Sequence, residues 1–202
     1  IITYNEEKNI REVLECFDFC DEIIVVDSYS KDKTIDIARS FSNVTIVQNK
    51  FEDYTKQRNL ALDLANNDWV FFLDGDERIS EKGKQEIIET VNNPNACGAY
   101  YIYRIFFLGQ QKIRFSGTQN DKNFRLFRKS KAHYDDLKKV HETLLVNGKT
   151  GLLENKLLHY SFENYDSFKE KMIYYGQLKG LELIQKGQKY SFFTKWNKTI
   201  FK

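Results

Sequence analysis

Apolar residues in the first half of the chain follow two spacings, one typical of helices and one typical of buried strands. Helical spacing begins at Ile10 and runs through Val13 and Leu14 to Phe17, and Asn5 is expected to cap this helix. The run from Glu22 to Asp27 is short, apolar and closed by a carboxylate, as expected of a parallel strand covered on both faces. The sequence therefore predicts that strands and helices alternate here.

The same alternation continues to residue 74. We expect a helix over 32–41, a strand over 44–48, a helix over 55–66 and a strand over 69–74. Strands that alternate with helices predict an α/β fold with a Rossmann-like, mostly parallel open sheet and helices on both faces.

Beyond a helix predicted over 81–92 and the only proline, Pro94, the pattern changes. Residues 98–109 form an aromatic-rich, strand-like run, and 124–128 is a second short strand. Asn147-Gly148 is a strong hairpin signal, and helical spacing returns over 165–186. We expect a small mixed or antiparallel C-terminal part and a long C-terminal helix.

Composition narrows the class of protein. The 41% hydrophobic and 30% charged residues are typical of a soluble globular protein. The 31 basic and 29 acidic residues nearly balance, which argues against nucleic-acid binding. The odd number of cysteines (Cys16, Cys20 and Cys97) provides no disulfide framework, so we expect buried structural thiols and a reducing, cytoplasmic setting.

No apolar run approaches the ~18 residues that a membrane span needs, and no signal peptide is evident. The chain opens on Ile1-Ile2-Thr3 without an initiator Met, so we expect a fragment of a longer protein. The tail 189–202 mixes aromatic residues with lysines, and two interpretations stay open. It could lie on the anionic inner face of a membrane, or pack on a further part of the protein.

Polar residues close the predicted strands. Ligands of open parallel sheets bind beyond the carboxyl ends of the strands, where Glu6, Asp27 and the Asp74-Gly75-Asp76 turn are expected to meet. Two carboxylates around a glycine can hold a hard divalent cation and admit a ligand closely. Such a cation would neutralise a departing diphosphate. An ordinary polar turn is the alternative.

Several motifs resemble those of a known family. TYNEEKNI, VVDSYSKDKT, KQRNLAL and WVFFLDGDERIS resemble, in order and spacing, the motifs of family 2 glycosyltransferases with the GT-A fold. FRLFRK, VHETLLVNGKTG and LLHY resemble the bacterial branch of lipopolysaccharide core glucosyltransferases. The resemblance implies Mn²⁺- or Mg²⁺-assisted transfer of a hexose from a nucleotide-sugar, expected to be a UDP-sugar, to a cell-envelope saccharide or lipid-linked acceptor. It also implies one catalytic domain over 1–202, with a nucleotide-binding half (1–97) and an acceptor-side half (98–202).

The resemblance also implies roles for individual residues. Thr3 and Tyr4 would line the nucleobase pocket, and Asp27 would accept a hydrogen bond from the uracil or ribose. Arg58, with Lys56 nearby, would approach the base or diphosphate. The full set expected at the donor is Thr3, Tyr4, Asn5, Glu6, Asp27, Lys56, Arg58, Asp74 and Gly75. Asp76, together with Asp74, would hold the metal.

The catalytic base is a separate question. An inverting transfer needs a carboxylate that deprotonates the acceptor hydroxyl. Many family members use a Glu-Asp pair downstream of the metal motif, which this sequence lacks, and its nearest counterpart is His141-Glu142. We take Glu142 as the candidate base, with Asp135 and Asp136 as rivals and a plain surface role as the alternative. His141 could contact a phosphate, the metal or the acceptor.

Three further residues are weaker candidates for the site. His159 could reach the diphosphate or the metal, and Arg125 and Arg128 could contact donor phosphates or an anionic acceptor. A half-buried histidine and a solvated strand face are the respective alternatives.

Other classes of protein fit less well. A haloacid-dehalogenase-like phosphatase would carry its Asp-x-Asp on the first strand, with Thr or Val two residues on, where this chain has Arg78. A dinucleotide-binding oxidoreductase would need a G-x-G-x-x-G motif, which is absent from the sequence. An inactive sugar-binding module would not need the metal carboxylates. The sequence identifies neither the sugar nor the acceptor, and it does not indicate the oligomeric state.

Overall fold

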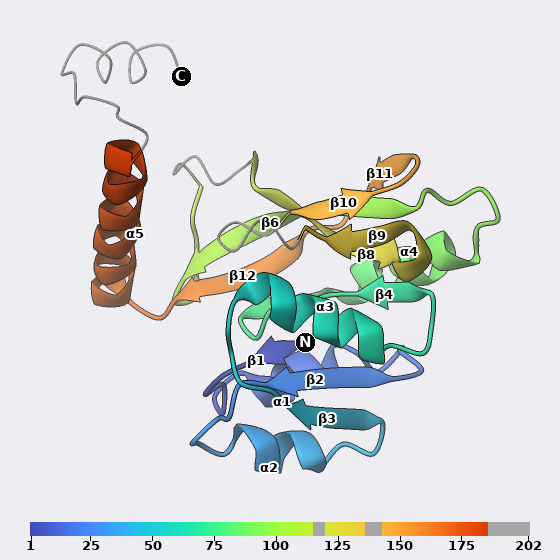
Figure 1. Ribbon diagram of the computed structural model, residues 1–202, viewed down its shortest axis with the longest axis horizontal. Helices are drawn as coiled ribbons and strands as arrows, with labels where there is room; N and C mark the ends of the chain where they lie inside the picture. Colours follow the sequence, from blue (N-terminus) through green and yellow to red (C-terminus); the bar gives the residue numbers. More distant parts are fainter. Residues whose placement is uncertain (115–119, 136–142, 186–202) are drawn as a thin grey trace, which may run out of the picture. The chain divides into compact units, whose positions relative to one another are not determined.

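The computed structural model describes residues 1–114, 120–135 and 143–185 (Figure 1). The chain divides into two compact units, 1–161 and 162–202. The first unit contains the strands of all three sheets, apart from Phe162 at the end of the last strand. In the second unit, α5 (Tyr165–Gln185) follows the end of β12 (Leu157–Phe162). The division of a single domain at residues 97 and 98 stays a prediction.

A parallel sheet forms the start of the first unit. Its strands are β1 (Ile2–Thr3), β2 (Ile23–Asp27) and β3 (Val44–Gln48), in the order β1-β2-β3. The crossovers contain α1 (Ile10–Glu15) and α2 (Thr34–Arg39). Thr3 pairs with Asp27 and Asp27 with Gln48, so the three strands end level. Their loops therefore leave from one edge of the sheet.

A second, mixed sheet has the order β4-β8-β6-β12-β5. It contains β4 (Trp69–Phe71), β5 (Glu77–Arg78), β6 (Ala99–Leu108) and β8 (Lys122–Arg128), and both β7 (Gln111–Lys112) and β11 (Thr150–Leu152) pair with β6. β4 pairs antiparallel with β8. The predicted α/β class is confirmed, with the parallel ladder in β1–β3 and β4 in the mixed sheet.

The hairpin predicted at Asn147-Gly148 is wrong. β10 (Leu144–Val146) precedes this turn and pairs antiparallel with β9 (Ala132–Tyr134), whereas β11 follows it and pairs parallel with β6. Gly148 does adopt the positive φ of +115° that a tight turn favours. The turn redirects the chain between two sheets because each flanking strand finds a longer-range partner.

Two further helices of the first unit begin at side-chain caps. The Asp53 carboxylate accepts a hydrogen bond from the Lys56 N–H at the start of α3 (Tyr54–Leu64), and the Ser80 hydroxyl accepts one from the Gly83 N–H at the start of α4 (Glu81–Asn92). A short 3₁₀ turn, η2 (Lys129–Lys131), joins β8 to β9.

Buried apolar residues form two clusters. One brings α1, β2 and α4 together and includes Leu14, Val25 and Ile87, and the other brings α3, β8 and β9 together and includes Leu62, Phe127 and Tyr134. These clusters hold the strand ends in fixed positions.

The first helix starts later than the sequence predicts. Its cap position is Asn9, and Ile10, Val13, Leu14 and Phe17 are buried as expected. Asn5 does not cap it. Asn5 adopts a left-handed φ of 55°, which Asn tolerates better than most residues, and its side chain serves a neighbouring loop.

Cys16 is buried, and Cys20 and Cys97 are half-buried, each as a free thiol. Burial raises the pKa of Cys20 to about 12, which keeps this thiol protonated and unreactive at neutral pH. Within the described ranges, no helix combines the length and apolar character that crossing a membrane requires.

Candidate active site

The loops after β1 and β2 are joined by hydrogen bonds at the carboxyl edge of the parallel sheet. The Asn5 N–H donates to the Ser30 hydroxyl at 2.8 Å, and the Asn5 side-chain oxygen accepts from the Lys31 N–H at 2.8 Å. Tyr29 adopts a left-handed φ of 62°, as Asn5 does. Two non-glycine residues in this conformation show that the loops are held in one arrangement at an energetic cost.

Asp27 organises the second of these loops. Its carboxylate is fully buried and accepts hydrogen bonds from the Ser30 N–H at 2.9 Å, from the Ser30 hydroxyl, and from the Gln48 side chain at 3.0 Å. The geometry therefore shows Asp27 fixing the β2 loop. A direct contact with a nucleotide stays a prediction.

Glu6 connects these loops to the Asp74-Gly75-Asp76 turn. Its N–H donates to the Thr34 hydroxyl at 2.7 Å. Its side chain covers Gly75 so closely that a Cβ there would lie 2.9 Å from Glu6 Cδ. Burial raises the pKa of Glu6, the hydrogen bond from Asn9 opposes this, and the charge of Asp76 adds to it. The expected convergence of three strand ends is present.

Two arginines hold Asp74. Arg58 Nη2 lies 2.9 Å from Asp74 Oδ1, and Arg125 Nη2 lies 2.6 Å from Asp74 Oδ2. Burial opposes ionisation of this carboxyl, but Arg125 and Arg58 outweigh it and hold the pKa of Asp74 well below its usual range. The Arg58 guanidinium also lies over the rings of Phe72 and Tyr134, at 5.4 and 5.8 Å.

Glu77 extends this network, and sequence reasoning missed it. Its side chain is fully buried and accepts hydrogen bonds from the Asp74 N–H at 3.1 Å, Arg125 at 2.5 Å and Arg104 at 3.2 Å. Arg104 also contacts Asp121, at 2.5 Å. A lone cation within the apolar strand 99–108 was the signal that could have revealed the network.

Asp76 points to a different partner from Asp74. Its Oδ2 lies 3.0 Å from His159 Nε2, and its carbonyl accepts from the Tyr160 N–H at 2.8 Å. The His159 ring is buried and packs against Phe106 with centroids 4.6 Å apart. Nδ1 of His159 is buried and has no hydrogen-bond partner within the described ranges. His159 is thus placed at the turn, and its contact with a diphosphate or metal stays a prediction.

The two arginines that could contact donor phosphates or an anionic acceptor, Arg125 and Arg128, both have carboxylate partners. Arg125 is buried between the carboxylates of Asp74 and Glu77, so its guanidinium serves those acids. Arg128 pairs with Asp68 at 3.0 Å and lies 4.4 Å over the Trp69 ring, at the amino end of β4. β8 runs antiparallel to β4 and carries Arg128 away from the Asp74-Gly75-Asp76 turn. A contact of either arginine with donor phosphates or an anionic acceptor stays a prediction.

The other donor residues have varied surroundings. Thr3 is buried, and its hydroxyl finds no hydrogen-bond partner among the described residues, whereas Tyr4 is 53% exposed. Lys56 lies on the exposed side of α3 and pairs with Glu52. Their contacts with a nucleotide stay predictions.

His141, Glu142 and Asp136 lie outside the described residues, as does the tail 189–202. Asp135 is described, and its N–H donates to the Thr143 carbonyl at 3.0 Å. The identity of the base therefore stays a prediction.

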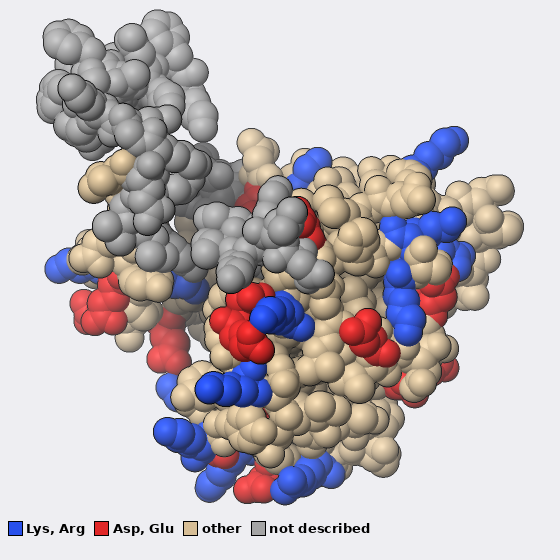
Figure 2. Space-filling view, in the orientation of Figure 1, with Lys and Arg blue, Asp and Glu red and all other residues tan. Residues whose placement is uncertain are grey.

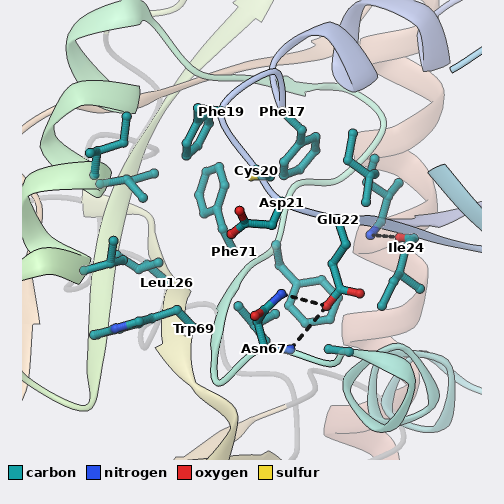
Figure 3. A pocket seen from close by; sticks show the side chains of 18 of the residues that line it. Phe17, Phe19, Cys20, Asp21, Glu22, Ile24, Asn67, Trp69, Phe71 and Leu126 are labelled. Carbon is teal, nitrogen blue, oxygen red and sulfur yellow. Dashed lines mark hydrogen bonds between the residues drawn. The ribbon is translucent and has the colours of Figure 1, made fainter. Parts of the chain in front are cut away.

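A hollow of about 340 Å³ lies at the opposite edge of the strands. Its lining includes Phe17, which follows α1, Glu22, which precedes β2, and Phe71, the last residue of β4 (Figure 3). Phe17 and Phe71 lie 5.7 Å apart, and Glu22 accepts hydrogen bonds from Asn67 at 3.2 Å. This hollow is separate from the Asp76 site.

Charge is mixed on the face shown in Figure 2, where acidic and basic side chains are interspersed. This mixture agrees with the near-zero net charge of +2. The face shown does not have the continuous basic surface that nucleic-acid binding favours.

A divalent cation fits Asp76 better than Asp74. Asp76 and His159 offer an oxygen and a nitrogen 3.0 Å apart, with the Glu6 carboxylate nearby, whereas two guanidinium groups already neutralise Asp74. Within the described ranges, no three acidic, His or Cys side chains gather as a complete cage. Remaining ligands would have to be water or phosphate oxygens, as is usual for Mg²⁺ beside a nucleotide.

Known proteins are similar to this chain in sequence and in fold. An uncharacterised glycosyltransferase of Rickettsia typhi is 32% identical over 205 residues, covering 96% of this chain and 70% of that protein. The lipopolysaccharide core biosynthesis glycosyltransferase LpsC of Rhizobium meliloti is 26% identical over 198 residues, covering 96% and 73%.

The solved structures support the fold. TarS of S. aureus, residues 1–349 in complex with UDP, superposes with a TM-score of 0.57 at 19% identity and covers 79% of this chain. This chain spans 58% of that TarS chain and 35% of a longer one. The family model "Glycosyl transferase family 2" matches residues 1–144, and the chain belongs to this family of glycosyltransferases.

Proposed function

We propose that this glycosyltransferase moves a hexose from a UDP-sugar to a saccharide or lipid-linked acceptor of the cell envelope, with inversion and with a divalent cation at Asp76. The observation that carries the proposal is the Asp76–His159 pair beside Glu6, at the strand edge where ligands of such sheets bind. LpsC acts in lipopolysaccharide core biosynthesis, and a TarS structure contains UDP. Both properties belong to those proteins and support the proposal for this one.

The residues of the chain divide the work at the site. Arg58 and Arg125 hold the Asp74 carboxylate, and Glu77 accepts a hydrogen bond from the Asp74 N–H, so the turn keeps one shape while a ligand enters and leaves. Asp76 and His159 would hold the cation, which when bound offsets the negative charge of a departing diphosphate. Preorganised charges of this kind act without rearrangement during the reaction.

On the donor side, Thr3 presents a buried hydroxyl that finds no hydrogen-bond partner within the described ranges. A buried hydroxyl without a partner is costly, and a base or ribose that bonds to it would remove this cost. Glu142 remains our candidate for the carboxylate that takes the acceptor proton. Action at the cytoplasmic face of the membrane is part of the same proposal.

The test measures UDP binding by calorimetry, with and without Mn²⁺. We expect Mn²⁺ to strengthen UDP binding to the wild-type chain. In Asp76→Asn, the factor by which Mn²⁺ raises the affinity for UDP should be at least about tenfold smaller. Asp63→Asn removes an exposed carboxylate of α3 and is the matched control. Equal Mn²⁺ dependence in Asp76→Asn and wild type would refute the proposed cation position.

Transfer itself needs a second measurement. Release of UDP from UDP-glucose or UDP-N-acetylglucosamine distinguishes an enzyme from a module that only binds sugar. We expect Glu142→Gln to bind UDP normally and to lose turnover. Turnover close to that of the wild type would move the base to Asp135, Asp136 or another carboxylate.

A further inference from the structure

A second hollow, of about 330 Å³, lies on β6 and β7 and is rich in cations. Four of its seven lining residues are basic: Arg104, Lys112, Arg114 and Lys156. The other three are apolar: Ile105, Phe106 and Ile113. Its volume is within the range of small-ligand sites, and it combines an apolar floor with polar groups as such sites do.

Two of its lining residues connect the hollow to the Asp76 site. The Phe106 ring packs on His159, which contacts Asp76. Arg104 lines the hollow and also contacts Glu77 at 3.2 Å. The hollow therefore adjoins the turn that would hold the donor, on the side formed by β6.

The cations of the hollow differ in their partners. Arg104 is neutralised by Glu77 and Asp121. Lys112 is exposed, and the Lys156 ammonium lies 5.5 Å over the Tyr103 ring. Neither lysine forms an ion pair with any residue that the structure describes. Two lysines without an ion-pair partner among the described residues give the hollow a local positive charge, although acidic and basic residues nearly balance over the whole chain.

We propose that this hollow binds an anionic group, phosphate or carboxylate, of the saccharide that accepts the sugar. The inference rests on the proposed function, because it assigns the acceptor side of the same site. Lys112 and Lys156 attract the anion, and Phe106 offers an apolar surface to the sugar ring. The position next to His159 would bring an acceptor hydroxyl toward the donor.

Glucose 6-phosphate and glucose are the probes, because they differ by one phosphate. Calorimetry with the full chain, at low salt, should show glucose 6-phosphate binding at least about tenfold more tightly than glucose. Lys112→Ala and Lys156→Ala should each lower the affinity for glucose 6-phosphate by about three- to fivefold, the range expected of one exposed charge pair. Lys82→Ala, on the exposed side of α4, is the matched control and should bind as the wild type does.

Titration with UDP separates the acceptor from the donor as the source of the anion. UDP affinity should be the same in Lys112→Ala, Lys156→Ala and wild type. If these variants lose affinity for UDP and for glucose 6-phosphate equally, the hollow binds the donor diphosphate, and this would overturn the inference. Equal affinity for both sugars, or an equal effect of Lys82→Ala, would also overturn it. If the wild-type chain binds glucose 6-phosphate but not UDP, this result would instead contradict the proposed function.

Discussion

Replacing Glu77 by Gln tests the charge network beneath the Asp74-Gly75-Asp76 turn. The Glu77 side chain has no exposure to solvent and receives Arg125 at 2.5 Å and Arg104 at 3.2 Å. Removing one partner of a buried ion pair costs about 3–5 kcal/mol, because the other charge stays buried. Arg125 keeps Asp74 and Arg104 keeps Asp121, so we expect the lower end, about 3 kcal/mol.

Urea unfolding, monitored by tryptophan fluorescence, measures this loss in the free energy of unfolding, and a thermal melt provides a second measure. For a chain of this size, about 3 kcal/mol corresponds to a fall in melting temperature of about 6–12 °C. Glu52→Gln makes the same chemical change in an exposed pair with Lys56 and should cost less than about 1 kcal/mol. If Glu77→Gln is no less stable than Glu52→Gln, Glu77 is not the centre of the network.

Two further predictions concern the same unit. Burial opposes ionisation of Asp74, but Arg125 and Arg58 hold its pKa well below the usual range. The stability that its carboxylate contributes is therefore complete above the unfolded pKa of about 4 and is lost as pH falls toward the folded value. The melting temperature of Asp74→Asn should depend less on pH below about 4 than that of the wild type, and parallel curves would contradict this. Gly151→Ala would place a Cβ 2.4 Å from Tyr100 Cε1 and should lower the free energy of unfolding by about 1–3 kcal/mol. In the control Gly180→Ala, the added Cβ meets no atom within 4 Å. Equal melting temperatures for the two variants would contradict the contact with Tyr100.

Local patterns predicted the positions of the strand ends well, because each one depends on a short segment. Apolar runs that close on a carboxylate located Asp27 and Asp74 at the ends of buried segments. Their loops meet through Glu6 although β4 belongs to the mixed sheet and not to the parallel one. The helical spacing around Leu14 predicted a buried face in the same way. These features need only the period of the sequence and the chain direction.

Long-range pairing could not be predicted in this way. Nothing local to Arg125 shows that β8 would lie antiparallel to β4 and bury its guanidinium beside Asp74. Asn147-Gly148 has the composition of a hairpin turn, but its flanking strands pair elsewhere. Asn5 suits a cap as well as a left-handed turn, and only the contacts with Ser30 and Lys31 decide between them.

The charged residues around Asp74 come from both halves of the chain, and this limits how the chain can be divided into segments. The acids come from the β4–β5 turn, but Arg104 and Arg125 come from β6 and β8, beyond residue 98. A recombinant 1–97 segment would expose one side of β4 and leave Glu77 without either cation. Replacing residues 98–202 by the corresponding segment of a relative would therefore preserve the Asp74-Gly75-Asp76 turn only if that segment supplied arginines at both positions.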